Sequence, residues 1–203
     1  MKKVLSLLCI MAAMVGSATA AGYVLPSNQP GALTPADIQP THGMEVLYAW
    51  GQKNVPDAWG VRGCFNLYSS GEGRFIHQFN IKAGVEFGDD DYSIMNEKID
   101  QELWMVPVTA GYDLNIGLCD NVFLDLGVKV GVATGSYEEK WNGLSASESF
   151  CACTAGAGVG IKVQCSDHLY LKAGYEFNRT FTDSDLGADM NQHLITAGLE
   201  IQF

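Results

Sequence analysis

The chain has 203 residues, of which 47% are hydrophobic, and a formal net charge of −11 at pH 7. Nucleic-acid binding needs at least one basic face, so this acidic balance argues against a nucleic-acid partner. The length suits about one domain, and beyond the N-terminus no apolar run reaches the roughly 18 residues that a membrane-spanning helix needs.

The first twenty residues have the three parts of a cleaved signal peptide. Lys2 and Lys3 form the basic start, residues 4–15 are apolar, and the Ala-Thr-Ala sequence at 18–20 is a cleavage site. We therefore expect export, with a retained helical anchor as the alternative. Residues 21–43 contain four prolines, which predicts a flexible leader on the periplasmic side.

The rest of the chain alternates between apolar and polar residues. From Val122 to Val132 the even-numbered positions are Val or Leu, whereas the odd ones include Asp125, Lys129 and two glycines. A period of two predicts β-strands with one apolar and one polar face. Eight such segments are expected, at residues 44–51, 58–68, 74–88, 101–116, 121–135, 149–163, 168–178 and 192–203.

The connections between these segments alternate between short and long, apart from a short first loop at 52–57. The long ones, at 89–100, 136–147 and 179–191, are acidic. This alternation is typical of outer-membrane barrels, with periplasmic turns and extracellular loops. Pro107 interrupts the fourth segment, and we expect a local bulge there because proline cannot donate to a ladder.

The polar face is rich in glycine and carries nearly equal numbers of acids and bases. A narrow eight-stranded lumen must mix small and large side chains, and buried charges must be paired. We therefore interpret the polar face as the lumen, against the alternative of a soluble lipocalin-like barrel. The predicted lumen charge network comprises Glu45, Arg62, Lys82, Glu86, Asp113, Asp125, Lys129, Lys162, Lys172, Glu176 and Glu200.

Aromatic residues gather near the ends of the segments. Trp50, Trp59 and Trp104 fall on the long-loop side, and Phe75, Tyr112 and Phe203 fall near the opposite rim. Two aromatic girdles around an apolar band are typical of proteins that cross a bilayer with strands. The sequence thus predicts an all-β fold, an eight-stranded antiparallel up-and-down transmembrane β-barrel over residues 44–203.

Five cysteines remain after residue 20, and their spacing matches no zinc site. Cys119 and Cys165 lie in two short turns that flank the fifth and sixth segments. Counting down from the intervening loop brings them to one level, so we predict a Cys119–Cys165 disulfide in the oxidising compartment. We expect no cofactor, and divalent-cation binding by the acidic loops stays an alternative.

The chain resembles the small outer-membrane β-barrel proteins of the OmpA-like, OmpX-like and opacity types. The resemblance rests on the signal peptide, the eight alternating segments, the segment Val106–Tyr112 and the closing Leu199–Phe203. It implies that Phe203 is the signal read by the barrel-assembly machinery. It also implies a monomer among outer-membrane lipid and lipopolysaccharide.

For function, we expect a non-enzymatic structural or surface-interaction protein that acts through extracellular loops with an unidentified ligand. A narrow gated channel is one alternative. A lipid-modifying enzyme is another, which would need a nucleophile beside a base. His77 and His193 fall on the lipid-facing register, and we expect no serine beside His77.

Overall fold

The computed structural model describes residues 41–51, 55–72, 74–94, 97–119, 121–142, 144–182 and 189–202. The predictions for the signal peptide, for the leader up to residue 40 and for Phe203 therefore lie outside the described residues. Among the described residues, no helix is long and apolar enough to cross a membrane.

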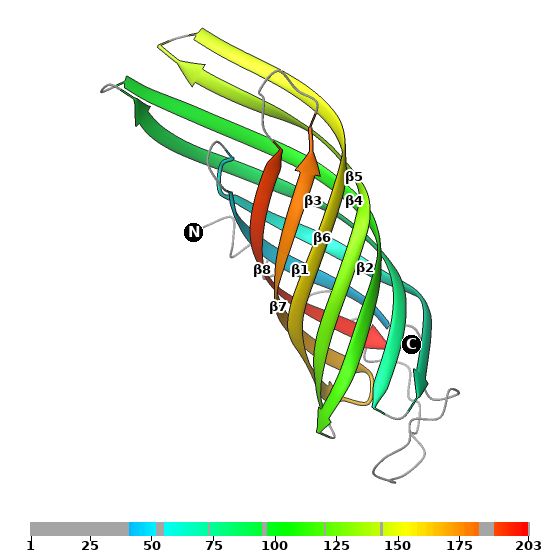
Figure 1. Ribbon diagram of the computed structural model, residues 1–203. Coiled ribbons are helices and arrows are strands. Elements are labelled where there is room, and N and C mark those ends of the chain that lie inside the picture. Colours follow the sequence, from blue (N-terminus) through cyan, green and yellow to red (C-terminus); the bar gives the residue numbers. More distant parts are fainter. Residues whose placement is uncertain are drawn as a thin grey trace.

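Eight antiparallel strands form a closed barrel in which each strand pairs with its sequence neighbours and β8 closes on β1 (Figure 1). This confirms the predicted fold class. The strands are β1 (Thr41–Gly51), β2 (Ala58–Glu72), β3 (Phe75–Ile94), β4 (Glu97–Cys119), β5 (Val122–Trp141), β6 (Leu144–Ser166), β7 (Leu169–Phe181) and β8 (Met190–Gln202).

The barrel has one wall, so alternation along a strand separates the lumen from the exterior. On β5, the Val128 side chain is 57% exposed, whereas the next residue, Lys129, is 9% exposed. Residues that pair across strands share a face. Val128 accordingly pairs with Tyr112 and Ala157, whereas Lys129 pairs with glycines on both sides. The apolar set therefore covers the outside and the polar set fills the lumen.

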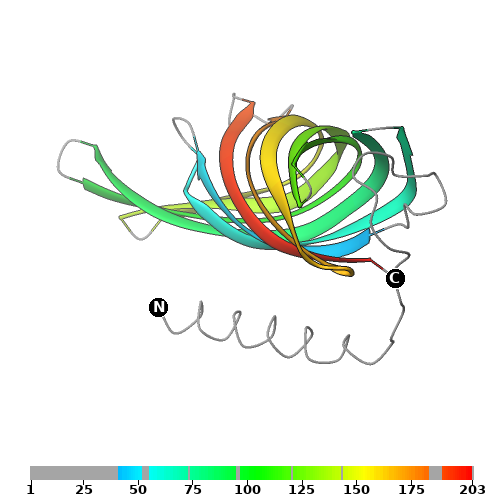
Figure 2. The ribbon, with the colours of Figure 1, turned by 90° about the horizontal axis from the view of Figure 1, so that it is seen from below.

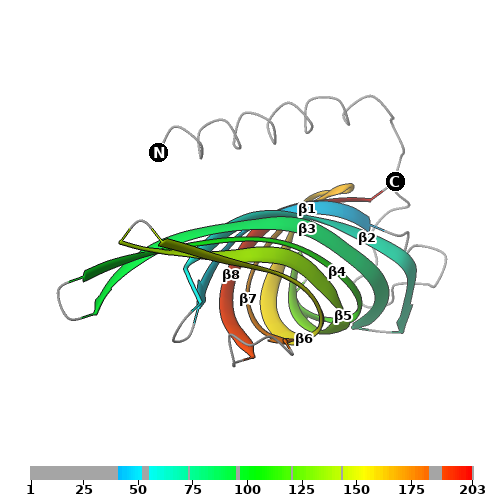
Figure 3. The same ribbon diagram turned by 90° about the horizontal axis from the view of Figure 1, so that it is seen from above.

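The two ends of the barrel differ. At one end, the short-turn end, tight connections join β2 to β3, β4 to β5 and β6 to β7. At the other, the long-strand end, the β3–β4 and β5–β6 hairpins run far past the rest of the wall (Figures 1, 2 and 3). The other four connections join strands at the long-strand end. Successive connections thus alternate between the two ends of the barrel, as an up-and-down barrel requires.

The predicted long loops at 89–100 and 136–147 are wrong. β3 continues to Ile94 and β4 begins at Glu97, while β5 continues to Trp141 and β6 begins at Leu144. The sequence pattern ends early because both faces of these extensions carry polar residues. The backbone ladder does not need an apolar face, so the strands continue where the alternation stops.

The predicted bulge at Pro107 is also wrong. The β3–β4 register is the same on either side, with Ala83 opposite Val108 and Glu86 opposite Met105, and pairing lapses only at the two positions between. On the β5 side, Pro107 pairs normally with Ala133. The missing N–H thus interrupts one ladder locally without a register shift. Register shifts occur instead near the short-turn end, for example between Gln164 and Ser166.

Aromatic residues form a row on the outer wall near the long-strand end. Tyr48, Trp59, Phe87 and Trp104 are cross-strand neighbours on β1 to β4. A second row, Tyr68, Phe79 and Tyr112, lies nearer the short-turn end. The stretch of β3 from Phe79 to Phe87 has about the nine residues that a tilted transmembrane strand needs. The outward residues between them are apolar, so the band has the extent that a bilayer requires.

Candidate functional site in the lumen and the projecting sheet

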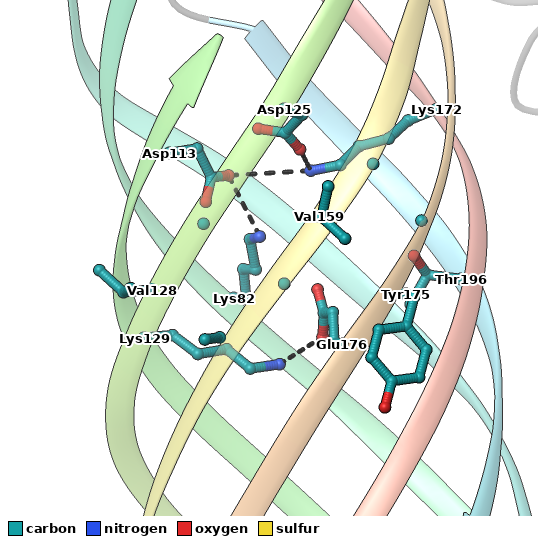
Figure 4. Close-up of a pocket in the computed structure, with 15 residues that line it drawn as sticks. Lys82, Asp113, Asp125, Val128, Lys129, Val159, Lys172, Tyr175, Glu176 and Thr196 are labelled. Atoms are coloured by element: carbon teal, nitrogen blue, oxygen red, sulfur yellow. Dashed lines mark hydrogen bonds and ion pairs between the residues drawn. The ribbon is translucent and has the colours of Figure 1, made fainter.

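The lumen contains all eleven charged residues that the sequence assigned to it, and each is buried. Arg62 lies at the centre of one cluster. Its Nε donates to Glu45 Oε2 at 3.0 Å, and its Nη1 donates to Glu176 Oε2 at 2.8 Å. Lys129 Nζ also donates to Glu176 Oε2, at 2.6 Å, so one carboxylate joins two cations (Figure 4).

A second cluster surrounds Lys172. Its Nζ lies 2.5 Å from Asp125 and 3.8 Å from Asp113, and Lys82 approaches the same Asp113 at 3.2 Å (Figure 4). Lys172 is also 3.6 Å from Glu45, which joins this cluster to the first. Lys162 pairs with Glu200 toward the short-turn end. The network therefore crosses the lumen and ties together strands that are distant in sequence.

Glu86 differs from the other lumen acids. It is 1% exposed, and the hydrogen bond described for it comes from Gln192 Nε2 at 3.4 Å. No ion pair to Glu86 occurs within the described residues. It is the sixth acid among five bases, so the lumen carries one carboxyl more than its cations can match.

The glycines of the polar face provide space for these long side chains. Glu176 pairs with Gly158 across β6 and β7, and a Cβ on Gly158 would lie 2.8 Å from Glu176 Cγ. Glu86 and Gly60 repeat the arrangement on β2 and β3, with a corresponding distance of 2.9 Å. Each long acid thus lies over a neighbouring residue that has no side chain, which explains the glycine content of this face.

Apolar side chains close the lumen toward the long-strand end. Leu47, Ala49, Ala58 and Leu194 form a buried cluster there, where β1, β2 and β8 approach their connections. Pro56, just before β2, is also fully buried. Two cavities of about 20 Å³ and about 10 Å³ lie among the lumen side chains. Each has room for about one water molecule, so side chains fill the lumen around them.

The predicted girdle residues lie on the outer wall. Trp59 and Trp104 are exposed in the aromatic row, and Phe75 is exposed at the start of β3. Trp50 is half-buried, and its ring stacks on His193 with centroids 5.5 Å apart. Tyr112 is half-buried, with its Oη 2.6 Å from His77 Nδ1.

The expectation that no serine neighbours His77 is wrong, because Ser70 lies directly opposite it on β2. A register shift between Asn66 and Tyr68 sets this pairing, and the sequence does not reveal such a shift. The hydrogen bond described for His77 joins it to the phenol of Tyr112. A hydrolase would also need an acid that orients the base, and the hydrogen bond described for His77 does not join it to a carboxylate.

The structure contradicts the predicted Cys119–Cys165 disulfide, and both thiols are free and exposed. Cys119 is the last residue of β4 and pairs with Val122, whereas Cys165 lies in β6. β5 stands between these strands. Two strand spacings make about 10 Å, and a disulfide joins Cα atoms at most about 7 Å apart.

Beyond the aromatic row, strands β3 to β6 form a projecting sheet, made of residues 89–94, 97–103, 137–142 and 144–149. The β4–β5 ladder runs through it from Leu103 opposite Tyr137 to Ile99 opposite Trp141. Its surface is acidic. The acids described in it are Asp89, Asp90, Asp91, Asp100, Glu102, Glu138, Glu139 and Glu148, against Lys98 and Lys140.

Acids of the sheet already engage both lysines. Lys140 Nζ donates to Glu102 at 2.7 Å, and this hydrogen bond raises the pKa of Lys140. Lys98 lies 2.8 Å from Asp100, and its hydrogen bond there raises the pKa of Lys98. Both lysines are therefore charged at neutral pH and paired within the sheet, which leaves the remaining acids as a negative excess.

A family model described as "Outer membrane protein beta-barrel domain" matches residues 5–203. The chain belongs to this family. A Gram-negative outer membrane is the location that the family implies, which agrees with the apolar band and the aromatic rows of the wall. A search of curated proteins found no significant match.

Solved structures share the fold of this outer-membrane barrel at low identity. Neisserial surface protein A is 13% identical, with a TM-score of 0.50, and the match covers 81% of this chain and 96% of that chain. A major outer membrane protein from Thermus thermophilus is 12% identical, with a TM-score of 0.50 and coverage of 80% and 99%. The attachment invasion locus protein Ail of Yersinia pestis is 15% identical, with a TM-score of 0.47 and coverage of 81% and 97%.

Proposed function

We propose that this barrel is a non-enzymatic surface protein whose long-strand end faces the outside of the cell and whose projecting sheet makes its interactions. The observation that carries the proposal is the continuation of β3 to β6 beyond the aromatic row. Outer-membrane barrels keep short turns in the periplasm and long connections outside. The short-turn end, where β1 begins and β8 ends, is accordingly the periplasmic end.

The projecting sheet is suited to binding because it is both rigid and remote from lipid. Seven residues separate Phe87 from Ile94 on β3, which is roughly 23 Å along the strand. Hydrogen-bonded pairs continue through this distance on β3–β4 and β5–β6. A binding surface on a rigid element costs less conformational entropy than one on a loose loop.

The wall and the lumen define the remaining parts of the proposal. The outward apolar band would contact outer-membrane lipid and lipopolysaccharide, and the protein would act as a monomer assembled by the barrel-assembly machinery. The lumen is an argument against the channel alternative, because ion pairs and the apolar cap fill it. The hydrogen bond described for the wall histidine, His77, joins it to a phenol and not to a carboxylate, which argues against a lipid-modifying enzyme.

The orientation is tested with Ser145→Cys in a background in which the five cysteines after residue 20 are replaced by serine. A membrane-impermeant maleimide should label this thiol on intact cells as fully as on lysed cells. A cysteine at Ser166, at the short-turn end, is the matched control and should label only after lysis. The reverse pattern would overturn the orientation.

The interaction role is tested by shortening both hairpins to the level of the aromatic row, with an Asn-Gly turn closing each pair of strands. Cells that display the full protein should adhere to a panel of immobilised extracellular proteins better than cells with the shortened barrel. The shortened barrel should still change its gel mobility on boiling, which reports a folded barrel. Equal adhesion of the two would contradict the role.

A further inference from the structure

One edge of the projecting sheet is open for pairing. The β5–β6 ladder runs out to Trp141 opposite Leu144, but the β6–β7 ladder ends where Cys153 pairs with Phe181. From Leu144 to Ala152, therefore, β6 is hydrogen-bonded on the β5 side, and no described strand pairs with its other side. A row of backbone N–H and C=O groups faces outward along this edge.

The opposite edge of the same sheet carries charged side chains of the kind that discourage pairing with another strand. The β2–β3 ladder ends at Ala58 opposite Gly88, and the three residues that follow on β3 are Asp89, Asp90 and Asp91. Consecutive charges discourage another strand from pairing with an edge. The β6 edge carries one charge, Glu148, and its other residues are small or apolar, including Ser145, Ser147 and Ser149. Within the described residues, therefore, the β6 edge is the one that has neither a paired strand nor consecutive charges.

Exposed apolar side chains lie beside the open edge. Ile99, Trp141 and Leu144 are cross-strand neighbours on β4, β5 and β6, so they share one face. Trp141 is 48% exposed and Leu144 is 68% exposed, although both lie far beyond the aromatic row. Aromatic and aliphatic anchors of this kind supply much of the affinity of an interface.

The charge of the projecting sheet favours one kind of binding partner for the open edge over another. Its acids outnumber its lysines, and both lysines are engaged in ion pairs with those acids. A second copy of this chain would bring two negative sheets together and oppose Glu148 with further acids, which is unfavourable. A basic strand would gain attraction from the same charges.

We propose that the β6 edge from Leu144 to Ala152 binds an extended, basic segment of a partner protein by strand addition, with apolar residues of that segment covering Trp141 and Leu144. Backbone hydrogen bonds would supply affinity, and the alternation of basic and apolar side chains would supply specificity. This inference rests on the proposed function, because the partner must reach the sheet from outside the cell.

The test uses the full barrel folded in detergent and a fluorescent eleven-residue peptide of alternating lysine and valine, followed by anisotropy. A peptide with the same side chains but N-methylated at every residue cannot donate its backbone hydrogen bonds and should bind at least about tenfold more weakly. An alternating glutamate–valine peptide should not bind. Equal binding of the methylated peptide would show attraction by charge alone and would overturn the proposal.

Matched variants place the site on one edge. Glu148→Lys and Asp90→Lys change the charge equally, on the same face of the sheet, but only Glu148 lies on the open edge. Glu148→Lys should weaken peptide binding at least about tenfold and Asp90→Lys less than about threefold, since the second acts only at a distance. Equal losses, or a larger loss for Asp90→Lys, would overturn the assignment.

A proline scan of the edge removes the backbone donor directly. Neighbouring residues direct their N–H groups to opposite sides of a strand. Of the two variants Ser147→Pro and Glu148→Pro, one therefore removes an N–H that bonds to β5, and the other removes only a free N–H of the edge. The second variant is recognised because its stability in urea is unchanged. That variant should lose peptide binding, and retained binding would contradict strand addition. If the protein alone forms dimers that this variant abolishes, the occupant is a second copy and the proposal is wrong.

These outcomes separate the inference from the proposed function. Peptide binding in detergent does not depend on orientation in the cell. Binding in detergent combined with failed labelling of Ser145→Cys on intact cells would overturn the proposed function alone. Labelling on intact cells without peptide binding would overturn the edge alone.

Discussion

The same four strands behave differently inside the apolar band and beyond it. In the apolar band, β3 to β6 alternate between apolar outward residues and mostly polar or small lumen residues, because lipid lies on one side and a packed lumen on the other. Beyond Phe87 and Trp104 the alternation fades, since water reaches both faces. The hydrogen-bonded ladder nevertheless continues to Ile94 and Glu97.

This comparison teaches that side-chain pattern and backbone pairing are separate sources of strand structure. In the band, the surroundings impose the pattern, and a wrong residue is costly on either face. In the projecting sheet, pairing alone maintains the strands, so the side chains are free to serve a partner. Substitutions should therefore have large effects in the barrel and small effects in the projection.

The largest effect is expected from Arg62→Met in the lumen. It leaves Glu45 and Glu176 buried, with one cation fewer between them, and should reduce the free energy of unfolding by about 3–5 kcal/mol. The measurement is urea unfolding in detergent, followed by tryptophan fluorescence. Arg179→Met is the matched control, because Arg179 pairs with Asp189 at an exposed site, and it should cost less than about 1 kcal/mol. Similar losses for the two would contradict the internal network.

A somewhat smaller effect is expected from Val128→Arg on the outer wall. Val128 is exposed to lipid near the middle of the band, and a charge there should cost about 2–4 kcal/mol in a bilayer. Ser147→Arg, on the outer face of the projecting sheet, should change stability by less than about 0.5 kcal/mol. Folding titrations in lipid vesicles measure both. Equal changes in stability for Val128→Arg and Ser147→Arg would contradict the proposed difference between the apolar band and the projecting sheet.

Lumen packing gives the next effect in size. Gly158→Ala would put a Cβ 2.8 Å from Glu176 Cγ, and the overpacking should cost about 1–3 kcal/mol. Gly117→Ala is the control, because the nearest atom to its added Cβ would be 3.6 Å away. Urea unfolding should rank Gly158→Ala well below Gly117→Ala in stability. A reversed ranking would show that the lumen relaxes around the added methyl group.

The sequence predicts the barrel well where the surroundings impose a pattern. The alternation of odd and even positions along each strand is enough to place Lys129 on the lumen side and Val128 on the lipid side. It also groups the charged residues that the structure brings together. The near balance of acids and bases has a physical cause, since an unpaired charge in so narrow a lumen is costly. Glu86 is the residue that this balance leaves over.

The alternation of residues cannot provide register, and the prediction that no serine neighbours His77 is wrong for that reason. A strand's neighbours depend on shifts of one residue, such as the one between Asn66 and Tyr68. Ser70 therefore lies beside His77 unexpectedly. The open edge of β6 was likewise invisible, because it depends on where β7 stops pairing rather than on any residue of β6.

The smallest effect is expected at the cysteines, where the sequence and the structure differ most. The structure leaves Cys119 and Cys165 free on strands that are not neighbours. The double variant Cys119→Ser, Cys165→Ser should therefore unfold at the same urea concentration as the parent, with or without reductant. A disulfide across a loop of this length would instead add up to about 4 kcal/mol under oxidising conditions alone. A reductant-sensitive midpoint in the parent, absent from the double variant, would restore the bridge and require β4 and β6 to approach each other beneath β5.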